Sequence, residues 1–171
     1  MTRVYTARAM TGRDAREVLA ESRAANQALR TYGLTPLDPA LDEGVQPGDG
    51  VLAAPEEKLR EFWRRDKALI RRAHVVLDLT GNRKSEGVAA ELGYARFFLW
   101  KPTVRVWPGL GPSIARFEGD VVVENVFQAA AVIKEKWGTP WKRVKWRAQM
   151  YLRCRVKALY YEAKEFANAV S

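Results

Sequence analysis

Residues 74–93 read HVVLDLTGNRKSEGVAAELG, and this stretch decides the fold that the sequence predicts. Residues 74–79 form a nearly continuous apolar run, which is typical of a β-strand buried on both faces. A polar loop follows over residues 80–85, and a helix is predicted from Glu86 to Leu99. A buried strand that leads through a short loop into a helix indicates a repeating strand–helix unit with parallel strands.

The same alternation of strands and helices continues on both sides of this stretch. Before it, the predicted elements are a strand at 3–7, a helix from about Asp14 to Tyr32 stopped by Gly33, a strand at 34–37, a long loop at 38–55 and a helix from Pro55. After it, they are strands at 103–107 and 120–123, a helix at about 124–137 and a last helix from Trp141 to about Ala169. Because crossovers between parallel strands place helices on both faces of a sheet, we predict an α/β fold. It has a parallel sheet of about five strands and is doubly wound, like flavodoxin or the Rossmann fold.

The domain organisation follows from chain length and from the spacing of apolar residues. With 171 residues, the chain suits a single domain, which we place at residues 1–138. Apolar residues recur at helical spacing after Trp141, with cations between them. We therefore expect residues 139–171 to form an appended basic amphipathic helix, packed on the domain or on a partner subunit.

Composition and residue usage exclude several classes of protein. The chain is 47% hydrophobic and 29% charged, as soluble globular proteins are, and no apolar run approaches the ~18–20 residues of a membrane span. A single cysteine, Cys154, excludes an internal disulfide, and with the single histidine, His74, it excludes a Cys/His zinc site. Residues 1–5 lead too soon into a charged helix for a signal peptide. We expect a cytoplasmic protein that needs neither a metal nor an organic cofactor.

Positive charge is concentrated near the C-terminus. The formal net charge is +9, and residues 134–157 contribute +8 of it, from nine cations and one acid. Three interpretations stay open for this segment: a packed helix with solvated Lys and Arg, a nucleic-acid contact that also uses Trp137, Trp141 and Trp146, or a basic helix on an anionic membrane surface.

The candidate site lies where the predicted strands end. In doubly wound folds, ligands bind at the carboxyl ends of the strands, which here lead into the loops at 7–13, 38–55 and 78–87. The sequence lacks the glycine-rich dinucleotide and P-loop signatures and the G-x-S-x-G elbow of hydrolases.

The loop at 78–87 carries the residues most suited to chemistry. Ser85 and Gly87 begin a helix, whose free N–H groups favour an anion, and Arg83 and Lys84 add positive charge there. Glu91 lies one to two turns into that helix among small residues, where a carboxylate can act as a nucleophile on a sugar carbon or as a general base.

This constellation resembles the nucleoside 2-deoxyribosyltransferase family, including its nucleoside 5′-monophosphate N-glycosidase (hydrolase) branch. The resemblance covers roughly residues 3–107. It rests on Val4-Tyr5, Arg65-Asp66, the run at 70–77, Ser85-x-Gly87-x-x-x-Glu91-Leu92-Gly93-Tyr94-Ala95, and Lys101-Pro102-Thr103-Val104.

The resemblance implies cleavage of the N-glycosidic bond of a (deoxy)nucleoside or its 5′-monophosphate. Glu91 matches the nucleophile that expels the base and forms a glycosyl ester, which water or a second base then resolves. Tyr5 matches the tyrosine that orients this carboxylate, and Asp66 the aspartate that assists the leaving base. The resemblance also implies a homodimer or a higher homo-oligomer.

The residue six positions before Glu91 departs from the pattern of the nucleoside transferases. These usually carry an aspartate there, whereas Ser85 can donate a hydrogen bond to a phosphate, as in the hydrolase branch. The first loop departs too, because it reads Ala-Arg-Ala-Met over residues 7–10 where the family often has Gly-Pro or Gly-Ser. We therefore expect the substrate to be bound by Ser85, Gly87, Arg8, Thr11 and Arg83, with Arg13 as a looser candidate. The base, the sugar, the choice between nucleoside and monophosphate, and the choice between hydrolase and transferase stay open.

Each of these residues also has a structural interpretation. Glu91 can be a solvated helix carboxylate, Asp66 a surface ion pair with its basic neighbours, and Tyr5 a core aromatic. For His74 a structural role is expected, and Asp78 is expected to cap the loop that follows it. The alternative for the whole chain is a non-catalytic module that binds nucleotide or nucleic acid through the basic C-terminal segment.

Overall fold

The computed structural model describes residues 1–10, 12–42, 56–81, 83, 85–108, 121–153 and 155. Its elements, in chain order, are β1 (Thr2–Ala7), α1 (Ala15–Thr31), β2 (Leu34–Leu37), α2 (Pro39–Asp42), α3 (Glu56–Arg72), β3 (Val75–Asp78), α4 (Glu86–Gly93), the π-helix η2 (Tyr94–Phe98), β4 (Thr103–Val106), β5 (Val121–Val123) and α5 (Val126–Trp137). Helical residues follow at 140–153. In the described residues, no helix has the length and apolar character needed to cross a membrane.

The five strands form one parallel sheet in the order β2-β1-β3-β4-β5, which confirms the predicted α/β class and strand number. The winding direction reverses between β1 and β3, because the chain first moves outward to β2 and then returns to the other side of β1. This is the flavodoxin-like order, in which the ligand site lies at the carboxyl ends of the strands beside that reversal.

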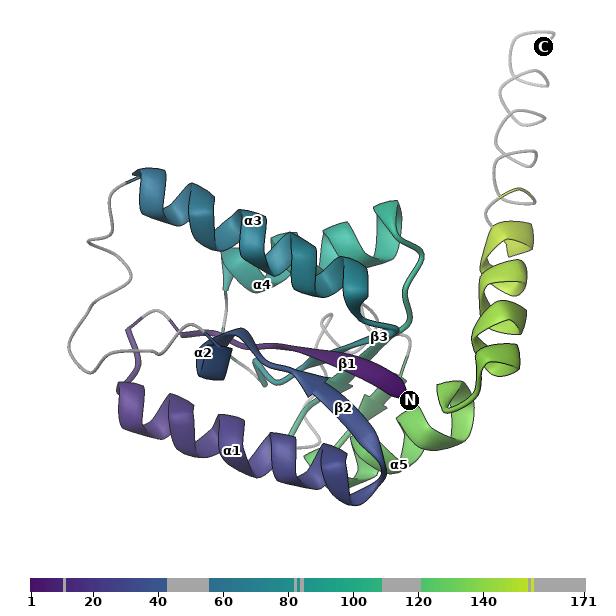
Figure 1. The fold of residues 1–171 in the computed structure, drawn as a ribbon, viewed down its shortest axis with the longest axis horizontal. Helices are drawn as coiled ribbons and strands as arrows, with labels where there is room; N and C mark the ends of the chain where they lie inside the picture. The colour runs from purple at the N-terminus through teal and green to yellow at the C-terminus, as the bar shows by residue number, and fades with distance from the viewer. Residues whose placement is uncertain are drawn as a thin grey trace, which may run out of the picture.

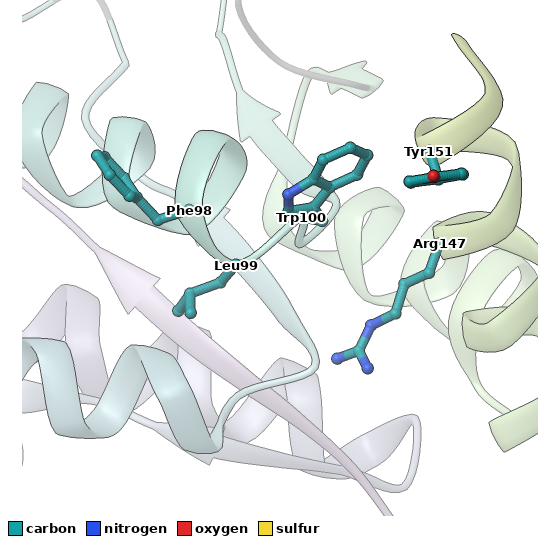
Figure 2. A pocket seen from close by; sticks show the side chains of 5 residues that line it. All are labelled: Phe98, Leu99, Trp100, Arg147 and Tyr151. Atoms are coloured by element: carbon teal, nitrogen blue, oxygen red, sulfur yellow. The ribbon is translucent and has the colours of Figure 1, made fainter. Parts of the chain in front are cut away.

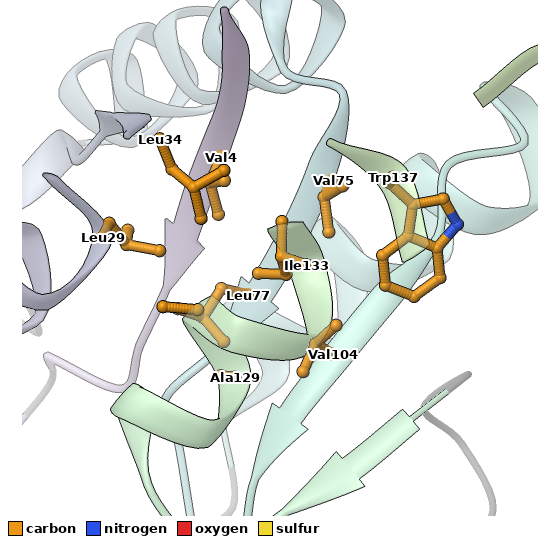
Figure 3. Close-up of a cluster of buried hydrophobic side chains, with 10 residues drawn as sticks. Val4, Leu29, Leu34, Val75, Leu77, Val104, Ala129, Ile133 and Trp137 are labelled. Carbon is orange, nitrogen blue, oxygen red and sulfur yellow. The ribbon is translucent and has the colours of Figure 1, made fainter. Parts of the chain in front are cut away.

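Helices cover both faces of the sheet, with α1 and α5 on one side and α3 and α4 on the other (Figure 1). Successive side chains of a strand point to opposite faces, so Val4 packs with the α1/α5 layer and Tyr5 with the α3/α4 layer. Figure 3 shows the first of these two hydrophobic clusters, in which Leu29 and Ile133 meet Leu77 of the central strand.

The sequence signals for helix ends agree with the structure. The Asp14 carboxylate accepts the Arg16 N–H at 2.7 Å and caps α1, and Gly33 follows the helix with φ 69°, a left-handed conformation that glycine adopts at little cost. The helix predicted from about Glu124 begins at Val126, because Asn125 takes the capping position.

The single helix predicted from Glu86 to Leu99 is wrong in one respect. The α-helix α4 ends at Gly93, and the chain continues through the π-helical turn η2. The wider turn buries Ala95 and leaves Phe97 and Phe98 exposed.

The helix at 140–153 begins against the amino end of β1 and then extends away from the sheet (Figure 1). Arg143 Nη1 donates to Thr2 Oγ1 at 2.8 Å and to the Trp137 carbonyl at 3.1 Å. Trp146 packs edge-on against Trp137 with ring centroids 5.7 Å apart. Cys154 and the predicted remainder of this helix from residue 156 to Ala169 lie outside the described residues.

Candidate active site

Three elements bring Tyr5, Asp66 and Glu91 together on the α3/α4 face of the sheet. Tyr5 is a fully buried residue of β1, and the charges of both carboxylates act on its hydroxyl. Asp66 precedes the buried Ile70 by one turn of α3, and Glu91 follows the buried Val88 by one turn of α4. Residues three or four apart share a helix face, so both carboxylates are turned toward the sheet.

The surroundings of the Tyr5 hydroxyl favour its protonated form. Burial raises the pKa of Tyr5, and the negative charges of Glu91 and Asp66 raise it further. No described group meets the hydrogen-bond geometry of this hydroxyl, although both carboxylates lie close to it. Tyr5 is therefore a permanent donor positioned between two acids, and a small shift of either carboxylate completes a hydrogen bond.

Asp66 has the electrostatic character of a proton donor. Burial raises the pKa of Asp66 to about 6, while the Tyr5 hydroxyl and Arg65 act in the opposite direction. Its Oδ1 atom is buried without a hydrogen-bond partner among the described residues. These are the properties of a partly buried carboxyl group, and they leave a protonated fraction near neutral pH.

Ser85 caps the amino end of α4, the helix that carries Glu91. Its Oγ accepts the Val88 N–H at 3.3 Å, so the hydroxyl hydrogen remains for another acceptor. Gly87 is exposed, and a Cβ there would meet only Ser85 Oγ, at an ordinary 3.9 Å. Nothing in the described chain requires glycine at this position, and the missing side chain keeps the free N–H groups of the first turn accessible.

Arg8 follows β1 and forms a buried ion pair that the sequence analysis missed. Its Nη2 lies 2.8 Å from Asp38 Oδ2, and the second oxygen of Asp38 accepts the Ala40 N–H that begins α2. Burial lowers the pKa of Arg8, and Asp38 opposes that shift. Nε and Nη1 of Arg8 are buried without partners among the described residues. The parallel pairing of Tyr5 with Leu37 explains the contact, because both strands end side by side.

The other predicted substrate contacts neighbour Glu21 of α1 or lie outside the described chain. Arg83 is exposed; the hydrogen bond from Arg13 lowers the pKa of Glu21 in α1 most, and the charge of Arg83 adds to this lowering. Arg13 is bound to the same glutamate at 2.6 and 2.7 Å, so its guanidinium already has an acidic partner. Thr11 and Lys84 lie outside the described residues.

Two further ionisable residues, Asp78 at the carboxyl end of β3 and His74 just before its amino end, are held by structural contacts. Asp78 accepts the Thr80 N–H at 2.9 Å and pairs with Arg105, a partner that the sequence analysis did not name. His74 Nδ1 accepts the Arg3 N–H at 3.0 Å, and burial first, then neighbouring cations, lower the pKa of His74 to about 4. His74 is therefore neutral at physiological pH. The described residues contain no cluster of three His, Cys, Asp or Glu side chains that could hold a metal.

The arrangement combines three chemical capacities in one place. Glu91 is a half-buried carboxylate that can attack an electrophilic carbon, Asp66 can deliver or accept a proton, and Tyr5 can hold either carboxylate by donation. The amino end of α4 beside them suits an anionic part of a ligand.

Comparison with known proteins places the fold among solved structures. No family model matches the chain, and no curated protein does. A 2-deoxyribosyltransferase from Bacillus psychrosaccharolyticus is similar with a TM-score of 0.58 and 21% identity, over 75% of this chain and 90% of that one. A conserved protein from Enterococcus faecalis V583 is similar with a TM-score of 0.52 and 18% identity, over 79% of this chain and 98% of that one. The CMP N-glycosidase BcmB from Clostridium botulinum has a TM-score of 0.48 and 12% identity, over 78% of this chain and 99% of that one. The first two of these similarities establish a shared fold.

Proposed function

We propose that this chain, which has the fold of a 2-deoxyribosyltransferase, is an enzyme that cleaves the N-glycosidic bond of a (deoxy)nucleoside or its 5′-monophosphate. The observation that carries the proposal is the meeting of Tyr5, Asp66 and Glu91, from β1, α3 and α4. In the resemblance to the nucleoside 2-deoxyribosyltransferase family, Tyr5 matches the orienting hydroxyl, Asp66 the proton-handling acid and Glu91 the nucleophile. All three lie on the α3/α4 face of the sheet.

In the first step, a Glu91 carboxylate oxygen forms a bond to the anomeric carbon while the carbon–nitrogen bond to the base breaks. The base keeps the electron pair of that bond and takes a proton from Asp66, whose pKa of about 6 provides the protonated form. The product is a glycosyl ester of Glu91 and a free base. Tyr5 donates its hydroxyl hydrogen to Glu91 and fixes the direction of attack.

In the second step, water or another base attacks the anomeric carbon and releases Glu91 as a carboxylate. The Asp66 carboxylate accepts the proton that the attacking group loses, as expected for the reverse of its first role. Two displacements at one carbon retain its configuration. With water the enzyme is an N-glycosidase, and with a base it is a 2-deoxyribosyltransferase.

We propose the 5′-monophosphate as the preferred substrate. The Ser85 hydroxyl hydrogen and the free N–H groups at the start of α4 suit a phosphate, and Gly87 leaves room for it. The exposed Arg83, in the loop before α4, supplies positive charge. An aspartate at position 85 would instead repel a phosphate.

The test is chromatography of the free base released from a panel of nucleosides and 5′-monophosphates, with and without an acceptor base. We expect release from monophosphates without acceptor, and no release by Glu91→Gln. Glu86→Gln, which changes an exposed carboxylate in the first turn of the same helix, is the matched control and keeps activity. Exchange that requires an acceptor would make the chain a transferase. An active Glu91→Gln variant would overturn the mechanism.

The remaining parts of the proposal concern assembly and location. We propose a homo-oligomer in the cytoplasm, and the exposed Phe97 and Phe98, 74% and 75% accessible, supply apolar surface for such an assembly. Nucleic-acid binding by the cations of residues 134–157 is a second candidate function. It is favoured because no ion pair joins these cations to a carboxylate in the described part of the chain.

A further inference from the structure

A hollow of about 400 Å³ lies at the edge of the sheet opposite the candidate active site. It is lined by Phe98, Leu99, Trp100, Arg147 and Tyr151 (Figure 2). One wall is the end of η2 and the turn that leads into β4, and the other wall is the C-terminal helix. That helix is anchored where β1 begins, whereas the candidate active site belongs to the carboxyl ends of the strands.

Two aromatic rings that line this hollow lie side by side. The ring centroids of Trp100 and Tyr151 are 6.0 Å apart, and their planes differ by 34°. Tyr151 is 54% exposed, and Trp141, on the same helix, is 74% exposed. Trp100 is half-buried, so the freely accessible π-face that lines the hollow is that of Tyr151.

The backbone at Trp100 is unusual for so large a residue. Its φ of 53° lies in the left-handed region, and it is the one non-glycine residue with positive φ in the described chain. Bulky side chains rarely adopt this conformation, which glycine and asparagine tolerate better. The turn therefore holds the indole beside Tyr151 in spite of a backbone preference against it.

The surroundings of the hollow are positively charged. Arg147 extends from the C-terminal helix into it (Figure 2). Arg147 and Arg3 contribute, after burial, to lowering the pKa of the nearby Lys101 to about 8, and Arg143 lies one turn before Arg147. In the described ranges, no carboxylate forms an ion pair with Arg3, Arg143 or Arg147. The field at this edge therefore favours an anion.

We propose that this hollow binds single-stranded nucleic acid, with a base stacked on Trp100 or Tyr151 and the adjacent phosphates paired with Arg147 and its neighbouring cations. Flat rings beside cations that have no carboxylate partner are the combination that recognises unstacked bases on a polyanionic backbone. Every base has a π-face, so the site tolerates different sequences. A duplex fits less well, because its bases are already stacked on one another.

The test is fluorescence anisotropy of the full chain with a labelled oligothymidylate of about 20 nucleotides and a duplex of equal length. We expect the single strand to bind more tightly, with affinity falling between about 50 and 200 mM salt. Trp100→Gly, which suits the local φ, and Tyr151→Ala should each weaken binding about fivefold or more. Arg147→Gln should weaken binding. It should also reduce the slope of log affinity against log salt concentration by about 0.7.

Two control variants separate this site from general effects of charge and exposure. Phe97→Ala removes an exposed ring of η2 that does not line the hollow, and Arg23→Gln removes an exposed cation of α1. Both should bind the oligonucleotide as the wild type does. Arg147→Gln should still release base from a mononucleotide at the wild-type rate, so that failure of this proposal and failure of the proposed enzyme activity are distinguishable.

Three results would overturn the proposal. If duplex and single strand bind with equal affinity, and Trp100→Gly and Tyr151→Ala bind as the wild type does, then the cations contact only the phosphate backbone and no base stacks on the rings. Arg147→Gln and Tyr151→Ala are substitutions at exposed positions that leave the fold intact. If both variants bind the oligonucleotide with wild-type affinity, the hollow is not the binding site. If Tyr151→Ala instead dissociates an oligomer in sedimentation and leaves oligonucleotide binding unchanged, the hollow is an interface between copies of the chain.

Discussion

Replacing Asp66 with asparagine should stabilise the protein at neutral pH while it removes activity. The pKa of this carboxyl is raised by burial from 3.8 to about 6 in the folded chain. The folded state therefore holds the proton more tightly than the unfolded state does, and stability is greatest below pH 4 and is lost as pH rises to about 6. Two pKa units correspond to about 3 kcal/mol, and solvent screening of this partly exposed group lowers the expected cost to about 1–3 kcal/mol.

Urea unfolding of the wild type and Asp66→Asn between pH 4 and 8 measures this cost. Because other groups titrate equally in both proteins, the difference between their free energies of unfolding isolates Asp66. We expect the variant to gain about 1–3 kcal/mol relative to the wild type from pH 4 to pH 7. A difference that stays constant over this range would show that the Asp66 pKa is not raised, and would refute the reasoning.

The same substitution has a kinetic counterpart. At pH 7 a carboxyl with a pKa of about 6 is roughly one-tenth protonated, so base release by the wild type should fall about tenfold per pH unit above 6. Asp66→Asn should slow release by about 10²–10⁴-fold and abolish this slope. Glu61→Gln, an exposed substitution in the same helix, is the matched control and should keep the wild-type profile.

Three other predictions concern the surroundings of the carboxylates. Tyr5→Phe removes the hydroxyl that lowers the pKa of Asp66, so the pH at which base release declines should move upward; an unchanged profile would separate the two residues. Ser85→Asp keeps a side-chain oxygen to cap α4 but places a negative charge there, so KM should rise for 5′-monophosphates and not for nucleosides, and equal changes in both would argue against a phosphate at Ser85. Asp38→Asn leaves the buried Arg8 guanidinium without its carboxylate and should lower the free energy of unfolding by about 3 kcal/mol; a loss below about 1 kcal/mol in urea unfolding would contradict a tightly buried pair.

The sequence predicted the elements of the fold well because each carries a local signal. Asp14 and Gly33 mark the ends of α1, and the apolar run at 74–79 contains β3. The π-turn after Gly93 escaped prediction, because α- and π-helical spacing leave almost the same pattern over five residues. Packing of Ala95 against the sheet decides between them, and the sequence does not display that contact.

For the candidate site, the sequence indicated the residue types, but it did not indicate the pairs that position them. Arg8 and Asp38 are 30 residues apart and meet only because β1 and β2 end side by side in register. Asp78 and Arg105 meet in the same way at the ends of β3 and β4. Such pairs depend on strand order, which periodicity alone does not determine.

The alternation along β1 has a consequence for protein engineering. Val4 and Tyr5 are neighbours in the chain, yet the first belongs to the cluster under α1 and α5 and the second to the layer that carries the carboxylates. The α1/α5 half can therefore be redesigned for thermostability, with volume-conserving changes at positions such as Leu29 and Ile133, while the reactive half keeps its geometry. Inserting or deleting one residue in β1 would do the opposite. It would exchange the two layers and place an aliphatic side chain where the tyrosine hydroxyl belongs.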